Sequence, residues 1–321
     1  MAGYARRPVV SDSHKTQQVW RQRIFSWFAA FTTCVVLVTL GGCNAMKLGY
    51  QQGDRLAYWW VDRYVDVSDA QEPPTREAIH RFFSWHRSQQ LPEIATVLTR
   101  VKGEVAQPVN AEMVHRVQQD TQRLGRQAFE NAIPDLADLL LTLTPEQITR
   151  MQAKFDESNA KYRKEFLRGN EAARTDARFD KVMDYAKLIY GRFSTEQEKT
   201  IKEAMGPYMQ GAEARYQQRL QRQKEWLGLA REVQASHPAK PQVEQMLRRY
   251  ADQWQRPGPE RSQSGVDLTV TIANLTTPEQ KAHAVDRFQK WIDDTRALIR
   301  EGNPSSASSS PAKAPSQASN N

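Results

Sequence analysis

The chain has 321 residues and a formal net charge of +8, from 45 Lys and Arg residues against 37 Asp and Glu residues. Basic and acidic residues alternate along it without a long block of either sign, which argues against a nucleic-acid-binding protein. The length suits one large domain or two smaller ones.

The first predicted element is an export signal. Residues 24–40, IFSWFAAFTTCVVLVTL, are apolar apart from one serine and three threonines, and Arg21 and Arg23 precede them. A basic flank, a short apolar run and then small residues are typical of such a signal. The alternative is an uncleaved membrane helix, but a run of about 17 residues is marginal for crossing a bilayer. The 18 residues before Val19 are long for a signal, so we expect translation to start at Val19.

The apolar run ends in a motif that resembles the lipobox of bacterial lipoproteins, formed by Leu40, Gly41, Gly42 and Cys43. The resemblance implies that residues 1–42 are removed as a signal peptide and that Cys43 carries a diacylglycerol on its thiol. The next residue is Asn44 and not aspartate, which by resemblance to Gram-negative lipoproteins implies the periplasmic face of the outer membrane. Two or three acyl chains would anchor the protein stably where one would not.

Removal of the signal changes what the composition allows. Cys34 is lost with it and Cys43 carries the lipid, so disulfides, cysteine nucleophiles and thiolate metal sites are excluded. The signal also takes five basic residues and one acidic residue, which leaves 40 and 36, or a charge of +4. We expect no cofactor besides the lipid on Cys43, and no nucleic-acid partner.

A recurring pentapeptide marks where helices are expected to begin. It reads VSDAQ at 67–71, LTPEQ at 143–147, FSTEQ at 193–197 and TTPEQ at 276–280. Serine or threonine followed three residues later by glutamine is a capping box, in which the two side chains satisfy each other's free backbone N–H groups. Proline directly after the cap suits the first helical position. We therefore predict helix N-caps with glutamine partners at Ser68 and Gln71, Thr144 and Gln147, Ser194 and Gln197, and Thr277 and Gln280.

Apolar residues recur at helical spacing after these caps and elsewhere, as at Ile148, Met151 and Phe155. Leu56, Trp59 and Trp60 also share a helix face, which we interpret as facing the core. The alternative is that these tryptophans rest at a membrane interface, where aromatic rings are favoured. The nearest approach to a strand, residues 267–275, is short. The predicted fold is an all-α, multi-helix bundle of amphipathic helices.

Helix-breaking segments divide the chain further. The predicted helical domain spans residues 43–302, and a subdivision is considered near residues 168–175. The remaining breakers lie at 103–110, Pro134, 235–242 and 256–265. Residues 303–321 are rich in Ser, Ala and Pro without a large apolar residue, so they are expected to be a disordered C-terminal tail.

Two resemblances bear on function. Leu143, Thr144 and Gln147 resemble the Leu-Thr-x-x-Gln motif of Spy-type periplasmic chaperones, although helix capping alone would explain the same residues. A broader resemblance, over most of residues 43–300, is to an uncharacterised family of Gram-negative lipoproteins known only as a domain of unknown function. It is carried by YWWVDRYVDVSDAQ at 58–71, WHRSQQLPEIATVL at 85–98, LLLTLTPEQI at 139–148 and RQKEWL at 222–227. It implies a helical lipoprotein and brings no catalytic residue.

Histidines provide the main candidates for a chemical site. Glu77 with His80 and Glu112 with His115 have the spacing used in ferritin-like dimetal sites, where the ligands point into the bundle. Helical spacing places both pairs on the solvent side, so we expect no metal site. His86 lies with the apolar stripe of its helix, which is more typical of a hydrogen-bonded core residue than of a catalytic base.

A basic ridge provides a candidate binding site. Arg215, Arg219 and Arg222 lie at i, i+4 and i+7 on one predicted helix, where they would suit an acidic peptide or an anionic glycan. The alternative is a solvated face, or pairing with carboxylates on a neighbouring helix.

These observations favour a lipid-anchored envelope protein that is not an enzyme and that binds other envelope proteins or unfolded clients in a chaperone-like way. Two alternatives stay open. One is an envelope enzyme acting on peptidoglycan or peptides, which would need two facing carboxylates or a His–Asp pair in a cleft. The other is a structural subunit of an envelope complex.

Overall fold

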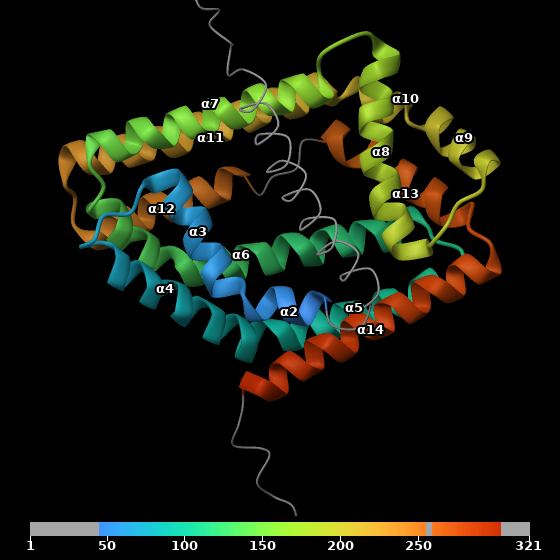
Figure 1. The fold of residues 1–321 in the computed structure, drawn as a ribbon, viewed down its shortest axis with the longest axis horizontal. Coiled ribbons are helices and arrows are strands. Elements are labelled where there is room, and N and C mark those ends of the chain that lie inside the picture. Colours follow the sequence, from blue (N-terminus) through green and yellow to red (C-terminus); the bar gives the residue numbers. More distant parts are fainter. Residues whose placement is uncertain (1–44, 255–258, 303–321) are drawn as a thin grey trace, which may run out of the picture. The chain divides into compact units, whose positions relative to one another are not determined.

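The computed structural model describes residues 45–254 and 259–302, and every regular element in these ranges is a helix (Figure 1). The fold class is therefore as predicted. The signal, the lipobox with Cys43 and the Ser/Ala/Pro tail lie outside the described residues. No helix in the described ranges is long and apolar enough to cross a membrane.

The chain divides into two compact units, residues 1–49 and 50–321. Only residues 45–49 of the first unit are described, as the beginning of helix α2 (Ala45–Gln51). The second unit contains α3 (Gly53–Val65), α4 (Glu72–Trp85), a π-helix η1 (His86–Gln90), α5 (Leu91–Val105), α6 (Ala111–Leu141) and α7 (Pro145–Phe166). Further along it are α8 (Glu171–Tyr190), α9 (Thr195–Ala204), α10 (Gly206–Gln210), α11 (Ala212–Ser236), α12 (Lys240–Trp254), α13 (Pro259–Asn274) and α14 (Pro278–Gly302).

One of the predicted breakers is wrong. Pro134 does not separate two helices, because α6 continues through it. A proline inside a helix removes one backbone hydrogen bond, and burial of the neighbouring Ile133 and Ala137 in the core offsets that loss. At the other breakers one helix ends and the next begins, although α8, α12 and α13 already start inside the marked segments, at Glu171, Lys240 and Pro259.

The capping boxes are confirmed at three of the four predicted sites. At Thr144, Ser194 and Thr277 the hydroxyl accepts from the backbone N–H three residues on, and the glutamine side chain accepts from the cap's own N–H. At Ser68 only the second half is present. There Gln71 accepts from the Ser68 backbone N–H at 3.0 Å, while the Ser68 hydroxyl donates to the same glutamine oxygen at 3.1 Å.

The four capping glutamines also form two pairs between distant parts of the chain. The Nε2 groups of Gln71 and Gln147 each donate to the other's Oε1, at 3.2 and 2.7 Å. Gln197 and Gln280 do the same at 2.8 and 3.2 Å. Each glutamine also donates to the backbone carbonyl two residues before its partner's cap, at Thr142, Asp66, Leu275 and Arg192. The same set of bonds thus occurs at two places.

The helices around these pairs repeat in order and packing. The first half runs from α3 to α7 and the second from α8 to α14. Each half starts with a helix that precedes a serine box, and each ends with a helix that begins at a Thr-Pro-Glu-Gln box. Helix α3 precedes the first serine box and packs on α7, just as α8 precedes the second and packs on α14. The last helix of each half packs on a helix of the other half, since α7 lies along α11 and α14 lies along α5 (Figure 1). The described part of the second unit is therefore an internal repeat of two interlocked halves.

Two apolar clusters hold the halves together. The first is centred on residues of α6, α7, α11 and α12, among them the fully buried Ile133, Val233 and Leu247. The second joins α5, α8, α9, α13 and α14 around Ile201 and Met205. Each cluster draws side chains from both halves of the repeat, so neither half has a separate core.

Candidate functional site

Helix α3 exposes the apolar residues that the sequence suggested it would bury. Leu56, Trp59 and Trp60 are 57, 56 and 56 % exposed, so the prediction that they face the core is wrong. The reason is that α3 carries apolar residues on two sides. Val61 and Val65 on its other side enter the first apolar cluster, and they determine how the helix packs.

Beside this exposed side, α3 and α7 enclose a half-open pocket of about 230 Å³. Two aromatic side chains and three basic side chains form most of its wall, together with one carboxylate and one hydroxyl. The α3–α7 pocket is lined by Trp60, Arg63, Tyr64, Lys154, Glu157, Ser158 and Lys161. The rings of Trp60 and Tyr64 lie 4.8 Å apart, and Tyr64 continues inward to Phe155 at 5.5 Å.

The three cations of the α3–α7 pocket surround its single carboxylate. Lys161 and Lys154 approach the Glu157 oxygens at 2.9 and 3.2 Å, and Arg63 approaches at 3.9 Å. Hydrogen bonds from Lys161 and Lys154 lower the pKa of Glu157 from 4.5 to about 2. With three cations against one anion, the pocket keeps an excess of positive charge that an added carboxylate would neutralise.

The three arginines of the predicted ridge are engaged within the fold. Arg215 is buried with its guanidinium 4.2 Å from the Tyr208 ring centre. Arg219 donates to Asn159 at 2.8 Å and to Ser158 at 2.7 Å, which ties α11 to α7. Arg222 is half-buried, and its backbone carbonyl accepts from a tyrosine hydroxyl. The structure therefore does not bring the three guanidinium groups together on one exposed face.

His86 lies where α4 passes into the π-helix, and it is half-buried. Its Nδ1 lies 2.9 Å from the Tyr50 hydroxyl, and the rings of Phe82 and Phe83 pack near it. Burial, and secondarily the charge of Arg87, lower the pKa of His86. This is the hydrogen-bonded apolar environment expected for it, with no carboxylate among its hydrogen-bond partners here.

Three of the four residues in the Glu–His pairs lie on the solvent side, as helical spacing indicated, whereas His115 is half-buried with its Nδ1 3.3 Å from Gln118 Oε1. Glu77 and His80 are 71 and 74 % exposed at their side chains, and the Glu112 side chain is 78 % exposed. Within the described ranges, no group of three or more His, Cys, Asp or Glu side chains has the geometry to hold a metal ion. His80 does lie 3.6 Å from Asp54, but on the open surface and outside the pocket described above.

The model of a family of unknown function, DUF6279, matches residues 63–257. The chain belongs to this family. No curated protein and no solved structure matches the chain. The DUF6279 match covers the boxes at Ser68, Thr144 and Ser194 and all of the α7 side of the α3–α7 pocket. It ends before the box at Thr277.

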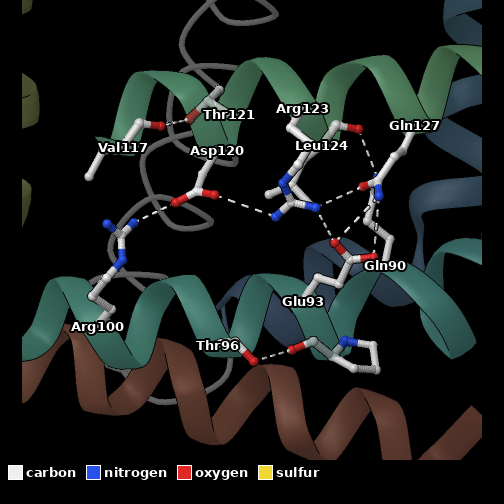
Figure 2. A network of polar contacts seen from close by, with 11 residues as sticks. Gln90, Glu93, Thr96, Arg100, Val117, Asp120, Thr121, Arg123, Leu124 and Gln127 are labelled. Atoms are coloured by element: carbon white, nitrogen blue, oxygen red, sulfur yellow. Dashed lines mark hydrogen bonds and ion pairs between the residues drawn. The ribbon is translucent and has the colours of Figure 1, made fainter. Parts of the chain in front are cut away.

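Facing carboxylates do occur in the DUF6279 region, between α5 and α6. Figure 2 shows Glu93 and Asp120 on opposite helices with the Arg123 side chain between them. Arg123 pairs with Glu93 and lies 3.4 Å from Asp120, which also accepts from Arg100 at 2.5 Å. Both carboxylates are thus neutralised by arginines. Together with a bond from buried Gln90 to a carbonyl of α6, these pairs hold the two helices together.

The lysines of the pocket escaped the sequence analysis for a physical reason. Lys154 and Lys161 lie at i and i+7 of α7 with Glu157 between them, so the sequence places them on one helix face. Nothing in that spacing shows that Trp60 and Tyr64, about ninety residues earlier, complete the pocket. The only local signal was the spacing of Lys154, Glu157 and Lys161, because oppositely charged residues three or four apart interact on a helix surface.

Proposed function

We propose that this DUF6279 chain is a lipid-anchored protein of the outer membrane's periplasmic face that binds acidic stretches of non-native polypeptide and has no enzymatic activity. The observation that supports binding is the α3–α7 pocket, where the exposed ring of Trp60 and the half-buried ring of Tyr64 lie beside an excess of positive charge. It replaces the arginine ridge of α11 as the binding surface.

The chemistry of the pocket suits a client without a fixed sequence. The Trp60 ring provides an apolar surface that any apolar side chain can contact. Lysines are flexible point charges that donate hydrogen bonds to carboxylates in many geometries. Lys161 is 67 % exposed at its side chain, so it reaches a client without a rearrangement of the fold. Contacts of this kind are weak individually, which allows rapid release.

The anchor is tested at Cys43. Cys43→Ser removes the thiol that would carry the lipid, so the precursor should stay unprocessed in the inner membrane. Fractionation of the membranes and mass spectrometry of the amino terminus measure this. Wild-type amounts of Cys43→Ser in the outer membrane would refute the lipid anchor.

The binding role is tested by suppression of aggregation. The full mature chain should slow aggregation of an unrelated unfolding protein without ATP, and added salt should weaken the effect, because exposed charges are screened over about 8 Å at physiological ionic strength. Lys154→Gln with Lys161→Gln should lower the activity while leaving helix content unchanged. The control removes the same charge from the exposed Lys181 and Lys199 on α8 and α9.

The outcomes separate the candidate roles. Loss of suppression in the pocket variant but not in the control supports the proposal, and absence of suppression by the wild type refutes it. Crosslinking in intact cells, followed by mass spectrometry, distinguishes the alternatives. Capture of many unrelated proteins favours a chaperone-like role, whereas one stoichiometric partner favours a structural subunit.

A further inference from the structure

The exposed side of α3 carries large apolar residues that the packing of the helix does not require. Its solvent-facing positions define the α3 face: Arg55, Leu56, Trp59, Trp60 and Arg63. They lie at helical spacing on one side of the helix, opposite Val61 and Val65 in the apolar cluster. Two exposed tryptophans beside a leucine form an apolar surface that only binding would remove from water.

The internal repeat supplies a comparison for this face. Helix α8 occupies the corresponding place in the second half, before a serine box and packed on the last helix of its half. When the last residues of α3 and α8 are aligned, the five positions become Asp180, Lys181, Asp184, Tyr185 and Leu188, all exposed. The second half therefore folds with Asp180 and Asp184 where the first half has Arg55 and Trp59, and with Lys181 where it has Leu56. The tryptophans of α3 are not a requirement of the architecture.

The chemistry of the α3 face fits the surface of a lipid bilayer. Tryptophan has an apolar body with a polar N–H and is enriched at the headgroup level of membranes. Arginine at both ends suits anionic headgroups, as in helices that lie in the membrane interface. The two carboxylates of α3 point elsewhere. Asp54 lies 3.6 Å from His80, and Asp62 accepts from the Val67 backbone N–H at 3.1 Å.

The chain length from the proposed anchor keeps this face near the bilayer. Leu56 is the thirteenth residue after Cys43, and residues 45–51 and 53–56 of this stretch are helical. With about 1.5 Å per helical residue and about 3.5 Å per extended residue, the reach is roughly 24 Å. A lipid on Cys43 would therefore hold α3 within that distance of the membrane surface.

We propose that the α3 face lies on the bilayer, with Leu56 and Trp59 in the headgroup region and Arg55 and Arg63 at anionic lipids. This rests on the proposed lipid anchor at Cys43. Since Arg63 also lines the α3–α7 pocket, the pocket then opens beside the membrane surface, where the protein would meet its clients.

The experiment uses the mature lipoprotein, purified from membranes and reconstituted into vesicles of phosphatidylethanolamine and phosphatidylglycerol whose acyl chains are brominated. Bromine quenches tryptophan emission only at close range, so the wild type should lose emission relative to vesicles without bromine. Trp59→Phe with Trp60→Phe should abolish most of that loss. Leu56→Gln, which keeps both tryptophans, should reduce it. The matched control is Tyr185→Gln on α8, which should leave it unchanged.

Mass spectrometry of Cys43 on the same sample separates this inference from the anchor. A lipidated protein without quenching, or with quenching that persists in the double phenylalanine variant, overturns the membrane contact and leaves the proposed function standing. An unlipidated protein refutes the anchor, and quenching on the same vesicles still decides whether α3 binds lipid. Tryptophans shielded from both bromine and aqueous acrylamide in a concentration-dependent way would assign the α3 face to a second copy of the chain, which also overturns the proposal.

Discussion

The side-chain amides of Gln71 and Gln147 donate hydrogen bonds to each other across 76 residues of sequence, at 3.2 and 2.7 Å. Both side chains are buried, and each also accepts from the backbone N–H of its own helix cap. One motif therefore does two things. It begins a helix, and it fixes the position of that helix start against the start of a second helix.

Gln147→Leu is expected to destabilise the protein by more than the loss of a cap. The change leaves the Thr144 N–H, the Asp66 carbonyl and the Gln71 amide without this partner. A buried polar group without a partner costs about 1–3 kcal/mol, so a total above about 2 kcal/mol is expected from chemical denaturation. The control is Gln119→Leu at an exposed position of α6.

The pair is further tested by a double variant. Because removal of Gln147 leaves Gln71 partly unsatisfied, changing both to leucine should cost less than the sum of the single changes, with a coupling of about 0.5–3 kcal/mol. Additive effects would show that the two glutamines act only as separate caps.

Thr144→Ala isolates the capping contribution. The hydroxyl of Thr144 accepts from the Gln147 backbone N–H at 3.3 Å, and its loss should cost about 1 kcal/mol of unfolding free energy. Thr149→Ala in the same helix is the control, because the Thr149 hydroxyl only donates back to the Pro145 carbonyl. That change should be neutral or stabilising, since alanine is the better helix former. Equal melting curves for Thr144→Ala and the wild type would contradict the role of the cap.

The sequence predicted what is decided locally. A capping box involves four consecutive residues, so Thr144, Ser194 and Thr277 could be recognised as helix starts without knowledge of the fold. The bond between Gln71 and Gln147 depends on how distant segments meet, and no local pattern contains it. The internal repeat was missed for the same reason, because its halves share box positions and packing more than they share residues.

The site residues show where periodicity fails. Helix α3 has apolar residues on both sides, and spacing alone could not decide that Val65 would be buried and Trp59 exposed. The arginines of α11 do lie at the spacing the sequence indicated, but spacing does not reveal what faces them. For Arg215 that is the ring of Tyr208, and for Arg219 it is the polar side of α7.

His86 is expected to make stability depend on pH. Its pKa is lowered in the folded state by burial, and also by Arg87, from an ordinary value of about 6.5. Below that value the unfolded chain takes up a proton that the folded chain resists, so stability should fall as pH decreases through the window just under 6.5. Denaturation measured across about pH 5.5 to 7.5 checks this, a range set at about one unit either side of the ordinary value.

Two variants assign that pH dependence. His86→Gln should remove this component of it, whereas His80→Gln, at a histidine whose side chain is 74 % exposed, should retain it. If His80→Gln removed the dependence and His86→Gln did not, the burial of His86 next to Tyr50 would not be its source.

The last prediction concerns the charge of the α3–α7 pocket. The Glu157 side chain is 43 % exposed, and hydrogen bonds from Lys161 and Lys154 lower its pKa to about 2. A folded pKa below the unfolded one means that the carboxylate favours the folded state above about 4.5, and that this contribution is lost as pH falls toward 2. An NMR titration of the Glu157 side chain should show the low midpoint. Lys161→Gln should raise it more than Lys154→Gln, and the double variant should bring it close to the ordinary glutamate range. Lys181→Gln on α8 should leave it unchanged. A midpoint near 4.5 in the wild type would contradict the hydrogen bonds from the two lysines to Glu157. Both lysines would then be available to bind a client carboxylate.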